Sequence, residues 1–158
     1  MGLQMTTSDA SRIEKQILIR APRQRVWRAL TNLEEFARWF QVKAQGAFQT
    51  GVRVDMVSTH PCGADAKFSV TVVAMDPEGL FSWSWCPGVK PPGADYDAEP
   101  STLVEFRLED AEGGTLVTVV ESGFDRLSLT RRAKALEENT KGWEIQLAAL
   151  DEYVGKSV

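Results

Sequence analysis

The last long segment of the chain has the apolar spacing of one amphipathic helix, and this helix constrains the fold more than any other feature. Glycine costs about 1 kcal/mol relative to alanine in a helix interior, so we expect another element to pack close to the helix axis at Gly142. The Trp143 indole should then point into the space between this helix and a sheet. The predicted stripe recurs three and four residues apart and comprises Leu136, Thr140, Trp143, Leu147, Leu150 and Val154.

The opening of the domain reads as one strand followed by two short helices. The strand is predicted over residues 13–20, and Pro22 suits the first turn of the helix that follows. The second helix is capped by Thr31 or Asn32. Its apolar positions are Phe36, Trp39 and Phe40.

From Val42 onward, alternating apolar residues separated by turns predict about six antiparallel strands. Residues 76–79 form a strong turn signal, and residues 112–114 form a hairpin turn supported by glycine. Between them, residues 80–85 place three aromatic side chains on one face and serines on the other. Residues 87–100, rich in proline, are predicted to be a long mobile loop.

An antiparallel sheet with helices on one face is an α+β arrangement. Such a sheet twists and curls, so we predict a curved antiparallel sheet of about six to seven strands around the long C-terminal helix. One helix does not fill the whole curl, and either side chains or a ligand fill the rest. We expect a flexible tail over residues 1–12 and a single domain over residues 13–158.

Composition argues against several classes of function. The net charge is −4 and the basic residues form no stripe, which argues against nucleic acid as a partner. No apolar run approaches the ~20 residues of a membrane span, and the start of the chain lacks the apolar core of a signal peptide. We therefore expect a cytoplasmic protein.

The sequence offers no convincing metal or cofactor motif. Cys62 and Cys86 stand alone, and His60 near Cys62 gives too few ligands for a closed zinc site. Glycine-rich phosphate loops, dinucleotide fingerprints and a Ser-His-Asp set are absent from the sequence. We predict no metal and no cofactor.

Several short motifs follow one another along the chain: Ala21-Pro22 with Val26-Trp27, Phe36 with Trp39-Phe40, Phe81-x-Trp83-x-Trp85, Glu121-Ser122-Gly123-Phe124 and Gly142-Trp143. In their order and spacing, these motifs resemble the START-like (SRPBCC) superfamily, specifically its branch related to the C-terminal domain of the activator of the Hsp90 ATPase. The similarity covers nearly the whole chain after residue 12. It implies a helix-grip fold with a deep apolar cavity, but not one activity. The chain departs from the family pattern at Arg53 and Asp55, where relatives tend to carry apolar residues.

We therefore expect a protein that binds a small hydrophobic or aromatic molecule between the sheet and the last helix. Mostly apolar pockets with a few polar groups are typical of such sites, although the same side chains would also form an ordinary core. The predicted ligand-binding residues are Phe36, Trp39, Phe40, Met56, Phe68, Val70, Phe81, Trp83, Trp85, Phe106, Glu121, Trp143 and Leu147.

Two alternatives stay open. An enzyme of polyketide-cyclase or hydratase type would use Glu121 or Asp55 as the acid–base group, because burial raises the pKa of a carboxyl. Glu105 and Arg107 are expected on the outer face of their strand. The second alternative is an Hsp90-associated interaction module, and an exposed strand edge or residues 87–100 would be the contact of a homodimer.

Overall fold

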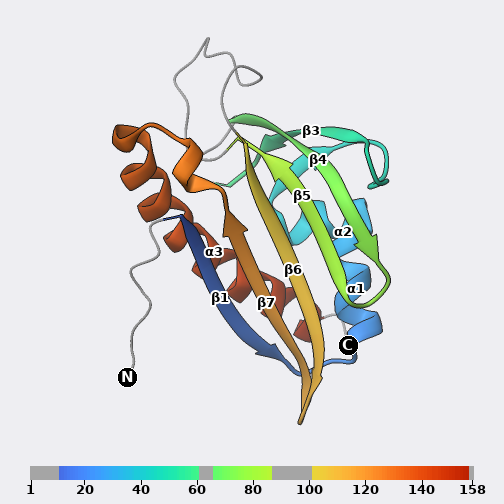
Figure 1. Ribbon diagram of the computed structural model, residues 1–158. Helices are drawn as coiled ribbons and strands as arrows, with labels where there is room; N and C mark the ends of the chain where they lie inside the picture. The colour runs from blue at the N-terminus through green and yellow to red at the C-terminus, as the bar shows by residue number, and fades with distance from the viewer. Residues whose placement is uncertain (1–10, 61–65, 87–100, 157–158) are drawn as a thin grey trace, which may run out of the picture.

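The described part of the chain forms one antiparallel sheet, three α-helices and a short 3₁₀ helix (Figure 1). The computed structural model describes residues 11–60, 66–86 and 101–156. Residues 1–10 of the predicted tail, Cys62 and the predicted loop lie outside these residues, whereas Arg12, the last residue of the predicted tail, begins the first strand. The elements are β1 (Arg12–Ile19), α1 (Arg23–Thr31), α2 (Leu33–Phe40), β2 (Val42–Ala44), β3 (Arg53–Ser58), β4 (Lys67–Asp76), β5 (Leu80–Trp85), β6 (Thr102–Ala111), β7 (Gly114–Ser122), the 3₁₀ helix η3 (Phe124–Arg126) and α3 (Leu129–Lys156). Their order confirms the predicted succession of strand, two short helices, strands and long helix.

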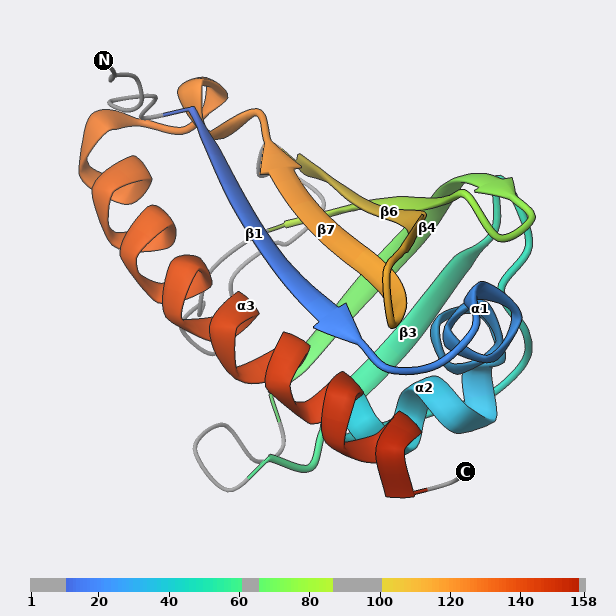
Figure 2. The ribbon, with the colours of Figure 1, turned by 90° about the horizontal axis from the view of Figure 1, so that it is seen from below.

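The seven strands form a single sheet in the order β1-β7-β6-β5-β4-β3-β2. Every neighbouring pair is antiparallel. Figure 2 shows that the sheet curves and that α3 runs along it, with α1 and α2 on the same side. The predicted α+β helix-grip fold is therefore confirmed.

Short-range signals explain where several elements begin. The Asn32 side chain accepts a hydrogen bond from the backbone N–H of Glu35 at 3.0 Å and so caps α2. Ser128 caps α3 in the same way through the N–H of Arg131 at 3.3 Å. At the β6–β7 turn, a Cβ on Gly114 would lie 2.1 Å from the Ile19 carbonyl oxygen, so only glycine fits there.

The expectation of a close approach at Gly142 is wrong. A Cβ built at this position has nothing within 4 Å, because the position borders open space beside the buried face of α3. The predicted stripe is correct from Trp143 to Val154, whose members are buried. Toward the start of the helix the buried face runs through Ala135, while Leu136 is only partly buried.

The charged residues of strand β3 lie on the outer face of the sheet, opposite to its apolar residues. Val54 and Met56 are buried, whereas Arg53 and Asp55 lie exposed on the outer face. Their charges therefore stay in solvent, where they cost least. Among the residues that the structure describes, no helix is long and apolar enough to cross a membrane.

Candidate functional site

Strand register places Glu121 in a row of apolar side chains on the inner face of the sheet. Glu121 of β7 pairs with Val104 of β6 on one side and with Ile13 of β1 on the other. Val104 pairs in turn with Trp83 of β5. All four side chains are buried, and Glu121 is 0% exposed. A carboxylate therefore lies inside the apolar layer between the sheet and the helices.

Four neutral groups donate hydrogen bonds to this carboxylate. Oε1 accepts from the Trp143 indole N–H at 2.8 Å and from the Asn139 amide at 2.9 Å. Oε2 accepts from the Trp85 indole N–H at 2.8 Å, the Thr102 hydroxyl at 2.5 Å and the Asn139 amide at 3.2 Å. The donors come from β5, β6 and α3, so Glu121 ties the sheet to the long helix.

These hydrogen bonds limit the role that the Glu121 carboxylate can play. Isolated buried carboxylates cost several kcal/mol unless hydrogen bonds compensate them, and here the compensating donors carry no charge. A carboxylate offers about four lone-pair sites, and the bonds to both oxygens occupy them. Glu121 is thus arranged to orient the two indoles, and no lone pair is left for a proton on a substrate.

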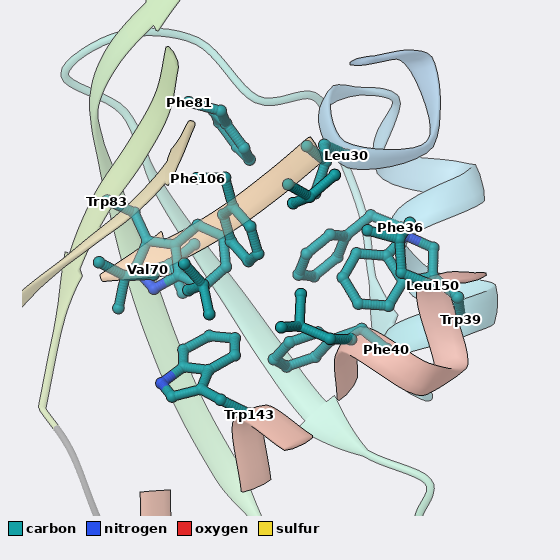
Figure 3. Close-up of a cluster of buried hydrophobic side chains, with 14 of the residues drawn as sticks. Leu30, Phe36, Trp39, Phe40, Val70, Phe81, Trp83, Phe106, Trp143 and Leu150 are labelled. Carbon is teal, nitrogen blue, oxygen red and sulfur yellow. The ribbon is translucent and has the colours of Figure 1, made fainter. Parts of the chain in front are cut away.

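The two indoles belong to a larger aromatic cluster that fills the space between the sheet, α2 and α3 (Figure 3). The rings of Trp85 and Trp143 are stacked, with centroids 5.7 Å apart. Trp83 lies 5.5 Å from Trp85, 6.3 Å from Trp143 and 5.3 Å from Phe106. On the helix side, Phe36 is 5.7 Å from Trp83.

The indole N–H groups of the cluster differ in their partners. Those of Trp85 and Trp143 bind Glu121, and that of Trp39 donates to the Ala29 carbonyl of α1 at 2.8 Å. The Trp83 side chain is 0% exposed. Its N–H has no acceptor in the part of the chain that the structure describes.

The structure brings the predicted ligand-binding residues together in this one cluster. Phe68 and Trp85 are partly buried, and the others are buried. Glu121 lies in the same strand as Val117 and Val119, four and two residues after them, and all three side chains are 0% exposed.

Several polar candidates lie elsewhere. Asp55 is exposed, and hydrogen bonds from Ser69 and Arg53 lower its pKa, so it is not placed to act in the interior. Glu105 and Arg107 form an ion pair of 3.1 Å on the outer face of β6, as predicted. The Thr140 hydroxyl bonds the Leu136 carbonyl of its own helix at 2.6 Å, a common habit of helical threonine.

Three members of the site were not identified from the sequence. Asn139 precedes Trp143 by one helical turn, and this spacing of four was the available signal. Thr102 lies opposite Trp85 in the β5–β6 register, which only strand pairing reveals. Phe48 lies between α2 and β3 without a periodic pattern around it, yet its ring is 5.2 Å from Phe36 and 5.1 Å from Phe81.

Comparison with known proteins gives one family and many similar folds. The family of Activator of Hsp90 ATPase homolog 1-like proteins matches residues 20–155. Protein MLL2253 from Mesorhizobium loti is 22% identical, with a TM-score of 0.70 over 93% of this chain and 98% of that chain. The Aha1 dimer from Colwellia psychrerythraea is 19% identical, with a TM-score of 0.69 over 90% of this chain and 95% of that chain.

A further similar structure is DynU16, a protein of the dynemicin biosynthetic locus. It is 20% identical, with a TM-score of 0.69 over 93% of this chain, which spans 48% of that chain. No curated protein matches this sequence. These structural similarities, all at low identity, establish the fold.

Proposed function

This chain belongs to the family of Activator of Hsp90 ATPase homolog 1-like proteins, and we propose that it binds a small apolar or aromatic molecule between the sheet and α3. The observation that carries the proposal is the buried Glu121 carboxylate with the Trp85 and Trp143 indoles fixed on it. The ligand would lie against these two rings and Trp83.

Glu121 distinguishes this interior from an ordinary core. Replacing buried charged groups by well-packed apolar residues is often neutral or stabilising, so stability alone does not account for a carboxylate here. Small-molecule sites, in contrast, combine apolar and aromatic walls with a few placed polar groups. The cluster around Glu121 has this composition.

The ligand would reach the cluster where its side chains are partly exposed. Phe68, Trp85 and Asn139 are only partly buried, in contrast to the fully buried Trp83 and Phe106. Phe68 and Trp85 are in contact, with centroids 5.9 Å apart. Because the rings of the cluster touch one another, binding requires some of them to shift, and the partly exposed rings have the most room to do so.

The bonded state of Glu121 favours binding over acid–base catalysis. Of the two acidic candidates, Asp55 is exposed and Glu121 already accepts four donors. A surface interaction with a chaperone or with a second copy of the chain is the remaining alternative. We place the protein in the cytoplasm as part of the same proposal.

A fluorescence titration with the neutral apolar probe N-phenyl-1-naphthylamine tests the proposal. We expect saturable binding to the wild-type protein and at least a tenfold weaker affinity for Trp143→Ala, because truncation removes a large aromatic contact surface. Trp27→Ala is the matched control. Trp27 is partly buried on α1 and takes no part in the bonds to Glu121, so its truncation should change the affinity by less than about threefold.

Equal affinities of the wild type and Trp143→Ala would contradict the proposal and place the bound probe elsewhere. Absence of saturable binding to the wild type would contradict it as well. In that case a surface interaction would become the better explanation of the family relationship.

A further inference from the structure

The indole N–H of Trp83 is a donor buried inside the aromatic cluster, and it makes no hydrogen bond to any residue that the structure describes. Among the described residues its nitrogen has no hydrogen-bond partner, although the side chain is 0% exposed. Buried donors are nearly always satisfied, and an exception calls for an explanation. Three other indoles of the cluster follow this rule, because the N–H groups of Trp39, Trp85 and Trp143 each donate to an oxygen atom.

We infer that the ligand carries a neutral hydrogen-bond acceptor oxygen, such as a carbonyl, that accepts from Trp83 Nε1. The inference rests on the proposed function, because it assigns the chemical class of the molecule bound at the same site. Indole N–H is a donor only, so the missing partner is an acceptor. A flat carbonyl compound would combine this acceptor with faces that pack on the rings.

The surroundings of Trp83 explain why the acceptor is supplied from outside the cluster. Its ring contacts are aromatic, with Phe81 at 5.7 Å, Phe106 at 5.3 Å and Trp85 at 5.5 Å. In the sheet its neighbours are Val72 and Val104. None of these side chains bears an oxygen. The nearby Glu121 oxygens are already taken by other donors.

Figure 3 shows the position of this donor. The ring nitrogens of Trp83 and Trp143 lie on the same side of the cluster, turned away from Leu30 and Phe36. Trp143 donates there to Glu121. A ligand oxygen at Trp83 would therefore lie on the polar side of the cluster, and the remainder of the ligand would face the apolar side chains.

Glu121 also determines the charge of the ligand. Its carboxylate is buried and bonded to neutral donors, and no lysine or arginine side chain of the described residues bonds it. An anionic ligand beside it would add a second negative charge in a weakly screened interior. The acceptor is therefore a neutral oxygen and not a carboxylate.

Fluorenone and fluorene provide a direct test, because the two flat molecules differ by one carbonyl oxygen. Titration of the wild-type protein should show about tenfold tighter binding of fluorenone, the size expected for one hydrogen bond to a buried donor. Fluorene-9-carboxylate should bind at least tenfold more weakly than fluorenone. The ratio of affinities within one protein needs no variant and is independent of folding.

Trp83→Phe removes the N–H and keeps an aromatic ring. We expect the preference for fluorenone to fall to about twofold or less, with fluorene still bound. Trp27→Phe, the same substitution at the edge of the cluster, where the ring lies 6.3 Å from Phe81 and makes no bond to Glu121, should keep the wild-type ratio. Thermal unfolding of both variants checks that they remain folded.

Each outcome separates the inference from the function on which it rests. Equal affinities of the wild type for fluorenone and fluorene would contradict the inference that the ligand supplies an acceptor to Trp83, but would leave an apolar ligand site intact. The same result is expected if a water molecule accepts the hydrogen bond of Trp83. Tighter binding of fluorene-9-carboxylate than of fluorenone would contradict the inference that the ligand is neutral. Failure of all three compounds to bind would contradict the proposed function itself.

Discussion

Glu121 shows how much of a single side chain can be read from sequence. The sequence placed Glu121 among the residues expected between the sheet and the last helix, and its side chain is 0% exposed. Its hydrogen-bond partners were not predictable in the same way. They come from three elements far apart in sequence, with Asn139 and Thr102 at separations of 18 and 19 residues. Local periodicity carries no information about such pairings.

The substitution Glu121→Gln tests the orienting role. The amide replaces one acceptor oxygen by a donor, which then faces N–H groups of Trp85, Trp143 or Asn139. We expect the free energy of unfolding to fall by about 1 to 3 kcal/mol, because buried donors lose their acceptor. Chemical denaturation followed by tryptophan fluorescence measures this change.

Glu109→Gln is the matched control for this prediction. Glu109 is exposed on the neighbouring strand β6, and its substitution should change stability by no more than about 0.5 kcal/mol. A Glu121→Gln variant as stable as the wild type would show that the carboxylate does not hold the indoles. The acid–base alternative would then regain its main candidate.

At the scale of elements, α3 illustrates a sequence signal that was interpreted incorrectly. Gly142 indicated a close approach, yet the structure leaves open space beside it. The energetic cost of glycine is therefore not offset by packing. A weak helix former at one position does not by itself reveal a neighbouring element, since propensity and packing are independent contributions.

The substitution Gly142→Ala is expected to raise the free energy of unfolding by about 0.5 to 1 kcal/mol. The gain comes from a less flexible unfolded chain, and no atom within 4 Å opposes the added methyl group. Gly114→Ala provides the contrast, because its Cβ would lie 2.1 Å from the Ile19 carbonyl oxygen. A loss of stability in Gly142→Ala, measured by urea denaturation, would restore the expectation of a tight contact.

The three helices meet at Glu35, which joins them through charged and polar contacts. Its carboxylate lies 2.9 Å from Arg25 Nη1, 2.8 Å from Arg28 Nε and 2.9 Å from the Tyr153 hydroxyl. Burial raises the pKa of Glu35. Hydrogen bonds from Tyr153 and Arg25, together with the charges of both arginines, lower the pKa by more than burial raises it, so the net change is a decrease from 4.5. The ionised carboxylate thus helps to hold α1, α2 and α3 together.

The lowered pKa gives this junction a defined pH dependence. Its contribution to stability is present above the ordinary value of 4.5 and is lost as the pH falls below it through the lowered value. We expect Glu35→Gln to lower the free energy of unfolding by about 1 to 3 kcal/mol at neutral pH. The difference from the wild type should shrink in acid, as denaturation at pH 7 and about pH 3 would measure.

Glu34→Gln is the control for the junction. Glu34 is the preceding residue, 78% exposed in its side chain and paired with Arg38 on the same helix. Such exposed pairs contribute little, so this variant should differ from the wild type by no more than about 1 kcal/mol at either pH. A Glu35→Gln deficit of the same size at both pH values would contradict the role assigned to its charge.

At the scale of the whole molecule, the sequence predicted the architecture and left the arrangement of the strands open. Element type and order followed from apolar periodicity and turn residues, and strand β5 coincides with the predicted segment 80–85. The position of β1 beside β7 depends on long-range pairing. The register that puts Trp83, Val104 and Glu121 in one row depends on it as well.

The central claim is that the interior between the sheet and α3 holds a small molecule. Native mass spectrometry of the protein purified from its own cells tests this most directly. We predict an additional small organic mass that is released on denaturation and is absent from the Trp143→Ala variant purified in the same way. Identical native and denatured masses for the wild-type protein, with no bound molecule, would contradict the account.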